Sequence, residues 1–354
     1  MIINGILLPE VPYSRGTFML KQLLKNGVLS IAKEPEDNPE NFADSPYIAT
    51  LIAHDYPGKT PTMWNAAYRE YGIPMQAVML VGDPVDAKTI CDALRSDPLY
   101  LGGGAGVGFK DEIVPFLDEM DPVARAIGSV NFIMKTTEGN LRGYNTDGEG
   151  YALSLEKVLK EKGRRIRSSL IVMLGAGGTG RSIAFALVGR GARVMILNRT
   201  IDKAKELANH VNEYFHVNLA TFGNEGLISE MVPIADVVIN VSTKGAVGTL
   251  ESYSPLAQAV LPATEVNIEN NRRQANAVLQ SMKGDTIVSD IILRKDKTPL
   301  LLSAENAGFT TLDGVPMVVR QGALAFWILH HDVLEERGIL RENVQEVMKN
   351  AAGL

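Results

Sequence analysis

Cysteine is almost absent from this sequence, because Cys91 is the only one among 354 residues. A single cysteine excludes a disulfide within the chain and favours a reducing compartment. The N-terminus also lacks a basic segment followed by a long apolar run, so we expect a cytoplasmic protein without a membrane anchor. Cys91 lies in a helical pattern, and we expect it to be a buried small hydrophobic residue without a catalytic role.

Blocks of positive charge are scarce. The one arginine-rich run covers residues 164–167, the formal net charge is -6 and the pI is about 5.5. This balance argues against binding to nucleic acid or to an anionic membrane, and it favours a small-molecule partner. The sequence leaves the oligomeric state open, and a homodimer is one of the states that it allows.

The length and composition predict two domains, since 354 residues exceed one ordinary core and 45% of them are hydrophobic. After an N-terminal extension over residues 1–45, with a helix at 17–24 and a polar linker at 34–40, strands and helices alternate. We expect strands at 48–53 and 77–81 and helices at 61–71 and 86–95. This alternation predicts a mostly parallel α/β sheet.

The second half repeats the alternation. A helix over residues 148–162 leads to a strand at 169–174, a helix at 181–188 and strands at 193–197 and 237–241, and helices at 315–334 and 341–351 close the chain. The expected fold is α/β with two domains. Residues 46–148 form a substrate-binding and catalytic domain to which residues 315–354 return, and residues 149–314 form a Rossmann-type dinucleotide-binding domain.

A glycine motif directly follows the strand at 169–174. It reads G-x-G-x-x-G and consists of Gly175, Ala176, Gly177, Gly178, Thr179 and Gly180. The first glycine permits a tight turn, the second lets the backbone approach a pyrophosphate, and the third lets helix and strand pack closely. The strand before the motif and the helix after it complete the pattern of a dinucleotide site.

The end of the next strand distinguishes between the two common dinucleotides. NAD sites usually place Asp or Glu there for the ribose hydroxyls, whereas this chain has Asn198, Arg199 and Thr200. Arg199 offers a charged, planar fork for a 2'-phosphate, so NADP is the expected cofactor and NAD the less favoured one. A later loop, residues 240–245, also follows an apolar strand, and we expect it, with Ser242, near the nicotinamide.

Several common catalytic motifs are missing. The sequence has no Ser-x-x-x-Tyr-x-x-x-Lys signature and no zinc-ligand cluster, so we expect no metal. We interpret four of its five histidines, His210, His216, His330 and His331, as structural residues on helix or strand surfaces. The fifth, His54, ends the first core strand and is a weak site candidate without an evident partner.

Three motifs between Lys110 and Gly148 carry a resemblance to a known family. Lys110 begins Lys-Asp-Glu-Ile, residues 126–131 read Ala-Ile-Gly-Ser-Val-Asn, and residues 144–148 read Tyr-Asn-Thr-Asp-Gly. The chain here resembles shikimate dehydrogenases, which carry a lysine opening a helix, an A-I-G-[AS]-V-N strand and a Y-N-T-D-G turn in this order. The resemblance covers roughly residues 47–331, and it includes Asn65-Ala66-Ala67-Tyr68 and the residues 298–301 and 313–323.

The resemblance implies roles for individual residues. It makes Lys110 and Asp147 the catalytic pair, which passes a proton as hydride leaves or arrives at carbon. It makes Asn131 and Gln321 substrate ligands, and it adds Gly314 to the cofactor site. Without the resemblance, Lys110 would be interpreted as a surface lysine and Asp147 as a turn residue.

The chain departs from the family at the substrate positions. The family's S-x-S-P motif, which holds the shikimate carboxylate, is matched by Gly58, Lys59 and Thr60 before Pro61. The threonine expected before the catalytic lysine is Gly106, and the nearest counterpart of an expected tyrosine is Leu293. We expect the glycine-rich residues 102–108 to be a loop that opens space for a bulkier ring, Thr60 to bind substrate and Lys59 to contact an anion.

These departures lead to the expected function. Each unmet polar group costs roughly 1–3 kcal/mol, so shikimate binding is expected to be weak. We expect an NADP-dependent oxidoreductase for a related cyclic hydroxy acid or polyol, such as quinate or an amino-substituted shikimate. The alternatives are an authentic shikimate dehydrogenase of aromatic amino acid biosynthesis and a non-catalytic protein that senses NADP(H).

Overall fold

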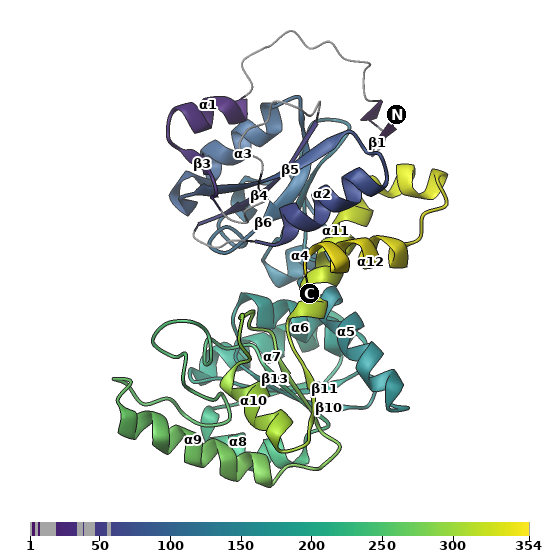
Figure 1. Ribbon diagram of the computed structural model, residues 1–354. Coiled ribbons are helices and arrows are strands. Elements are labelled where there is room, and N and C mark those ends of the chain that lie inside the picture. The colour runs from purple at the N-terminus through teal and green to yellow at the C-terminus, as the bar shows by residue number, and fades with distance from the viewer. Residues whose placement is uncertain are drawn as a thin grey trace. The chain divides into compact units, whose positions relative to one another are not determined.

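The computed structural model describes residues 2–3, 6–7, 19–33, 38, 47–54 and 58–353, so most of the predicted linker at 34–40 lies outside the described residues. The chain divides into two compact units (Figure 1). The first unit comprises Met1–Thr146 and Val318–Leu354, and the second comprises Asp147–Met317. The sequence placed the corresponding boundaries after residues 148 and 314.

The sheet of the first unit has seven strands in the order β3-β5-β4-β6-β8-β9-β7. The central strand β4 pairs in parallel with β5 and β6, while β3 and β8 join the sheet antiparallel. The bounds are β3 Leu29–Ile31, β4 Tyr47–Ala53, β5 Met75–Gly82, β6 Tyr100–Ala105, β7 Glu119–Met120, β8 Phe132–Lys135 and β9 Leu141–Tyr144, with a separate pair of β1 Ile2–Ile3 and β2 Ile6–Leu7.

Helices cover both faces of this sheet because the residues of β4 alternate between two cores. Tyr47 and Ala49 pack with α2, α11 and α12, whereas Ile48 and Ile52 pack with α1 and α3. A strand buried on both faces is mostly apolar, and all seven residues of β4 are buried, with Thr50 the one polar residue among them. The helices are α1 Met19–Lys25, α2 Thr60–Glu70, α3 Ala87–Ser96, α4 Pro122–Ile127, α11 Val315–Glu336 and α12 Arg341–Ala351, with the 3-10 turns η1 Pro84–Asp86 and η2 Val114–Phe116.

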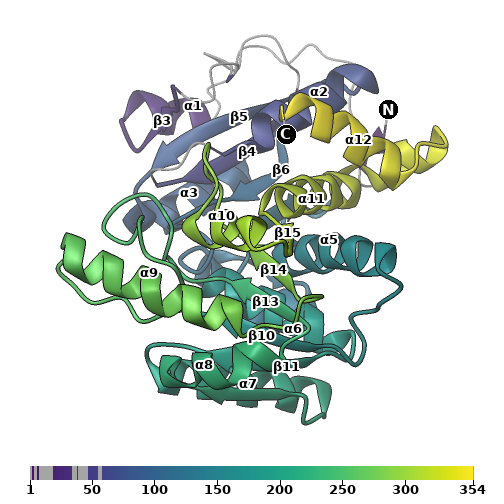
Figure 2. The same ribbon diagram turned by 60° about the horizontal axis from the view of Figure 1, so that its bottom comes forward.

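The second unit has six parallel strands in the order β12-β11-β10-β13-β14-β15 (Figure 2). Counted along the chain, this is the strand order 3-2-1-4-5-6 of the Rossmann fold, which confirms the predicted α/β fold with a Rossmann-type half. The strands are β10 Leu170–Leu174, β11 Arg193–Leu197, β12 Ala220–Gly223, β13 Val237–Asn240, β14 Ile287–Asp290 and β15 Thr310–Leu312. The helices are α5 Asp147–Glu161, α6 Gly178–Gly189, α7 Ile201–Phe215, α8 Ile228–Met231, α9 Glu265–Gln280 and α10 Pro299–Asn306, with the 3-10 turns η3 Glu225–Leu227 and η4 Val232–Ile234.

Three local predictions were wrong. The glycines 102–104 belong to the buried strand β6 and not to an open loop. Residues 126–131 are not a strand, because α4 ends at Ile127, Gly128 adopts the left-handed conformation that closes it, and β8 begins only at Phe132. Lys110 lies in a series of turns rather than at the start of an α-helix, since Pro115 cannot donate the backbone hydrogen bond that a continuing helix needs.

No helix among the described residues is long and apolar enough to cross a membrane. Cys91 is fully buried in α3, as predicted, and burial raises the pKa of its thiol to about 11.

Candidate functional site

A hydrogen-bonded cluster of polar side chains lies at the carboxyl end of β6 in the first unit. Asn131 Nδ2 donates to Thr146 Oγ1 at 2.9 Å and to Gln321 Oε1 at 3.0 Å, and Asn131 Oδ1 accepts from the Thr146 amide at 2.8 Å. The Thr146 hydroxyl also donates to the Gln321 carbonyl at 3.1 Å. The structure therefore brings together the two predicted substrate ligands, Asn131 and Gln321, although they are 190 residues apart.

The Tyr-Asn-Thr-Asp-Gly turn is fastened to the segment that carries Asn131. The Asn131 amide donates to the Tyr144 carbonyl at 3.0 Å, and Asn145 Nδ2 donates to the Ser129 carbonyl at 3.0 Å. Thr146 completes the contact and is only 2% exposed. Thr146 was not among the predicted site residues, although its place inside the quoted motif was a signal that could have identified it.

Each of the two predicted catalytic residues is tied to this cluster through a neighbour in the chain. The Lys110 carbonyl accepts from the Val130 amide at 2.8 Å, and Val130 precedes Asn131. Asp147 follows Thr146 directly, begins α5 and is 5% exposed. Lys110 itself is partly buried.

Two positions at which the chain departs from the family, Gly58 and Gly106, and the glycine-rich Gly104 are closely packed. A Cβ on Gly58 would overlap Leu51 Cδ2, and a Cβ on Gly104 would lie 2.6 Å from Leu51 Cδ1. A Cβ on Gly106 would lie 2.8 Å from the Ala53 Cβ. The expectation that the glycines open space is therefore wrong, because neighbouring atoms already occupy the volume.

Thr60 and Lys59 lie at the start of α2. Thr60 is the first residue of this helix and is partly buried, and Lys59 is its exposed N-cap without a capping side-chain bond. Within the described part of the chain, the hydrogen bonds of the cluster do not include Thr60. Its predicted contact with substrate stays a prediction.

Two histidines differ from expectation. His54 does have a partner, since its Nδ1 lies 3.2 Å from the Gly82 carbonyl. His330 was expected on a surface but is fully buried, with its Nε2 3.2 Å from the Tyr68 hydroxyl. Burial lowers the pKa of His330 to about 3, so its environment is that of a neutral core side chain.

In the second unit, the glycine motif forms a tight turn between β10 and α6. Gly175 has a φ of +122°, and a Cβ there would lie 2.9 Å from the Ser242 amide nitrogen. A Cβ on Gly180 would lie 3.1 Å from Val241 Cγ2, so this glycine lets α6 pack against the end of β13. Gly177 caps α6 without a side-chain hydrogen bond, and no atom lies within 4 Å of its Cβ position. Among the described residues, no side chain therefore caps the first turn of α6.

The residues predicted to contact the ribose, Asn198, Arg199 and Thr200, follow β11 at the same edge of the sheet. Asn198 Nδ2 donates to the Thr200 carbonyl at 2.8 Å, which folds the three residues into a compact turn. Arg199 and Thr200 are exposed. The structure therefore leaves the guanidinium of Arg199 accessible at the end of the second strand.

The loop after β13 is held by a buried network. Ser242 donates through its amide and its hydroxyl to Asn240 Oδ1, at 3.0 and 2.7 Å. Asn240 Nδ2 donates to Asp290 Oδ1 at 3.1 Å, and burial raises the pKa of Asp290 to about 6 despite this bond and another from Thr298. In this loop Lys244 also pairs with Glu225 at 2.8 Å, a contact that the sequence did not reveal.

Gly314 is a glycine for steric reasons, because a Cβ there would lie 2.5 Å from the Ile291 carbonyl oxygen. Leu293 is partly buried in the segment between β14 and α10.

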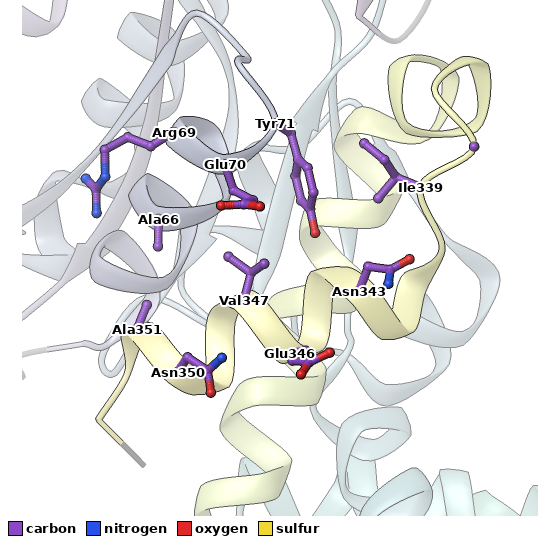
Figure 3. A pocket seen from close by; sticks show the side chains of 11 residues that line it. Ala66, Arg69, Glu70, Tyr71, Ile339, Asn343, Glu346, Val347, Asn350 and Ala351 are labelled. Carbon is purple, nitrogen blue, oxygen red and sulfur yellow. The ribbon is translucent and has the colours of Figure 1, made fainter.

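The pocket in Figure 3 lies away from these residues, between α2 and α12, and has a volume of about 870 Å³. None of the predicted site residues lines it. Tyr71 stands against α12 with its hydroxyl buried, and burial, Glu70 and Glu346 raise its pKa. The pocket is therefore lined by charges of both signs, the positive Arg69 and the negative Glu70 and Glu346.

Comparisons with known proteins place the chain in a family. The model of the shikimate dehydrogenase substrate-binding domain matches residues 51–133, and that of shikimate/quinate 5-dehydrogenase matches residues 157–251. The shikimate dehydrogenase (NADP+) of Alkaliphilus metalliredigens is 32% identical over 270 residues, which is 75% of this chain and 85% of that one. That of Methanopyrus kandleri is 32% identical over 309 residues, 85% of this chain and 96% of that one.

A solved structure agrees with these matches. A crystal structure of a shikimate dehydrogenase in complex with NADP+ has a TM-score of 0.68 and 29% identity, and the match covers 86% of this chain and 94% of that one. The sequence relatives and the solved structure thus indicate the same family. The chain belongs to the shikimate dehydrogenase family and is an oxidoreductase enzyme.

Proposed function

We propose that this protein is an NADP-dependent oxidoreductase that transfers a hydride between the nicotinamide and a ring hydroxyl or ketone of a shikimate-like cyclic acid or polyol. The observation that carries the proposal is the cluster of Asn131, Thr146 and Gln321. This cluster holds the amide side chains of Asn131 and Gln321 together, and it is linked to Lys110 through Val130 and to Asp147 through Thr146. The name of the relatives, shikimate dehydrogenase (NADP+), supports both the reaction and the cofactor.

The residues of the second unit fit an NADP molecule. The positive φ of Gly175, the close packing at Gly180 and the uncapped start of α6 provide a cradle for the pyrophosphate. Arg199 provides a permanent positive charge where the second strand ends, and the described turn contains no carboxylate to repel a 2'-phosphate. NADP supplies the hydride or accepts it at its nicotinamide.

Lys110 and Asp147 supply the proton transfer in this proposal. In the direction of oxidation, the C–H hydride leaves the ring carbon while the hydroxyl proton passes to Lys110 Nζ. In the direction of reduction, Lys110 returns a proton to the carbonyl oxygen. Asp147 orients the lysine and balances its charge. Asn131 and Gln321 orient the ring hydroxyls, with Thr146 holding the Asn131 amide in place.

The packing around Leu51 favours a substrate other than shikimate. Gly58 and Gly106 stand where the resemblance leads one to expect hydroxyl side chains, and the adjacent volume is occupied by Leu51 and Ala53. A site that lacks hydrogen-bond donors binds a carboxylate less well, by about 1–3 kcal/mol for each lost partner. A related ring compound with a different substituent at this place is therefore our first candidate.

Authentic shikimate dehydrogenase activity is the second candidate. It is favoured by the curated relatives at 32% identity, both of which carry that name. In this case Thr60, at the first turn of α2, and Lys59 would replace the missing donors.

An assay of a substrate panel distinguishes the two candidates. The panel contains shikimate, quinate, amino-substituted shikimates and neutral cyclic polyols, and turnover is measured as NADP+ reduction at about 340 nm. Turnover of a panel member other than shikimate supports the first candidate. Efficient turnover of shikimate supports the second. NADP(H) binding without turnover of any member contradicts both and favours a protein that senses the cofactor.

A further inference from the structure

Lys244 is a buried lysine that the proposed mechanism does not use. Its Nζ lies 2.8 Å from Glu225 Oε1 and donates to the Ala257 carbonyl at 2.8 Å. The two paired side chains are only 8% and 15% exposed. Because a buried charge is costly without a partner, this ion pair holds the loop after β13 to the segment after β12.

The strand order shows where the ion pair lies. Glu225 follows β12 and Lys244 follows β13, and the parallel strands β11 and β10 stand between them. The carboxyl ends of all four strands meet at one edge, so the ion pair lies along the edge at which β11 also ends. Arg199 follows β11 at this edge. The loop that bears Lys244 therefore reaches toward the end of the cofactor site that carries the ribose, and not only toward the nicotinamide.

The electrostatics agree with this placement. Burial lowers the pKa of Lys244, Glu225 raises it, and Arg199 lowers it further. Two positive groups are thus close enough to interact, with one carboxylate partly neutralising them. A dianionic phosphate near Arg199 would relieve the repulsion between the two cations.

We propose that Lys244, held in place by Glu225, is a positioning residue that sets the charge at the 2'-phosphate end of the cofactor site and so selects NADP over NAD. The inference rests on the proposed cofactor and adds a second cation to it. Lys244 adds positive electrostatic potential near Arg199, which attracts the 2'-phosphate, and the negative charge of Glu225 reduces that potential. The two side chains should therefore influence cofactor selection in opposite directions.

Direct titration of the full chain with NADPH and with NADH, followed by cofactor fluorescence, tests this. In Lys244→Met we expect NADPH to bind about five- to tenfold more weakly, with NADH changed less than about twofold, because only NADPH carries the extra phosphate. In Glu225→Gln we expect NADPH to bind about two- to threefold more tightly, since the positive field is less compensated. Added salt should reduce both differences.

The double variant and two matched controls separate this effect from a loss of structure. The double variant Lys244→Met/Glu225→Gln removes both charges of the ion pair. Its preference for NADPH over NADH should therefore fall between those of the two single variants. The control variants Lys283→Met and Asp285→Asn each remove one charge, positive and negative respectively, just before β14, at the opposite edge of the sheet. They should not alter the preference for NADPH over NADH. If Lys244→Met does not fold, Glu225→Gln alone still gives the predicted sign.

Two results would overturn the inference. Equal weakening of NADPH and NADH in both single variants would show that the ion pair is only structural. Tighter NADPH binding in Lys244→Met would contradict the assigned sign. A wild-type protein that binds neither dinucleotide would instead contradict the proposed function, and with it the basis of this inference.

Discussion

At the scale of single residues, glycines decide how close neighbouring strands approach at the carboxyl edge of the first unit. Gly106 follows β6, and a Cβ there would face the Ala53 Cβ at 2.8 Å and the Ile52 carbonyl oxygen at 3.3 Å. Both are part of the rigid strand β4 and cannot rotate away. The chain therefore has no room for the threonine that the resemblance leads one to expect at this position.

Gly106→Thr should destabilise the protein. Overpacking against fixed atoms costs about 1–3 kcal/mol, which urea unfolding followed by circular dichroism would measure. The matched control is Gly284→Thr, because no atom lies within 4 Å of the Gly284 Cβ position and the residue is exposed. An unfolding free energy that is equal for both variants and the wild type would show that the edge of β4 adapts to the added side chain.

The residue scale also shows the limit of sequence reasoning about the site. Asn131 and Gln321 lie 190 residues apart, and only the resemblance to a family suggested that they act together. Lys244 and Glu225 carry no local signal, since each looks like a solvated charge until the strand order brings the two loops to one edge. Thr146 could have been assigned, because it stands inside a motif that was already identified.

At the scale of elements, α11 contains a buried histidine in an aromatic core. His330 departs from helical geometry with a φ of -118° and a ψ of 17°, and its ring centroid lies 4.4 Å from that of Phe326. Its Nε2 contacts the Tyr68 hydroxyl of α2. This contact joins α11 to α2 within the core of the first unit.

The stability of the folded protein should decrease as the pH falls below about 6.5. Burial holds the pKa of His330 at about 3 in the folded protein, below the ordinary value of 6.5, so only the unfolded chain takes up a proton between these values. The stabilisation is complete above pH 6.5 and is lost toward pH 3, by about 1.4 kcal/mol per pH unit.

Replacement by a side chain that does not titrate isolates this contribution. Urea unfolding of the wild type and of His330→Gln, whose amide can still bond to Tyr68, should be compared across about pH 7 to pH 5. The wild type should lose stability more steeply than the variant. Parallel pH dependences in the two proteins would mean that His330 is protonated without cost in the folded state.

The elements that were predicted correctly have a clear apolar periodicity, and those that were missed are rich in glycine or turn at a glycine. The strand β4 and helices α2, α3 and α6 were predicted because apolar periodicity and flanking breakers mark them. The glycines of β6 were predicted as a loop because glycine disfavours strands, yet β4 and β8 bury this segment on both sides. The strand at residues 126–131 was expected only from the resemblance, and it was wrong because Gly128 adopts the left-handed conformation that ends α4, which composition does not reveal.

At the scale of the whole molecule, the chain combines two units with different tasks in the proposed reaction. The second unit carries the glycine motif and Arg199, which fit a dinucleotide. The first unit carries Lys110 and the Asn131 cluster, which fit a ring alcohol. The division predicts that proton transfer and cofactor binding can be separated by mutation.

The most direct measurement compares NADP+ reduction by the wild type and by Lys110→Ala with the best substrate of the panel, together with NADPH titration of both proteins. The account predicts that kcat falls by about 10² to 10⁴ in the variant, because the proton-transfer group is lost, while the NADPH dissociation constant stays within about twofold. A Lys110→Ala protein that retains the wild-type kcat would contradict the assignment of Lys110 as the group that transfers the proton.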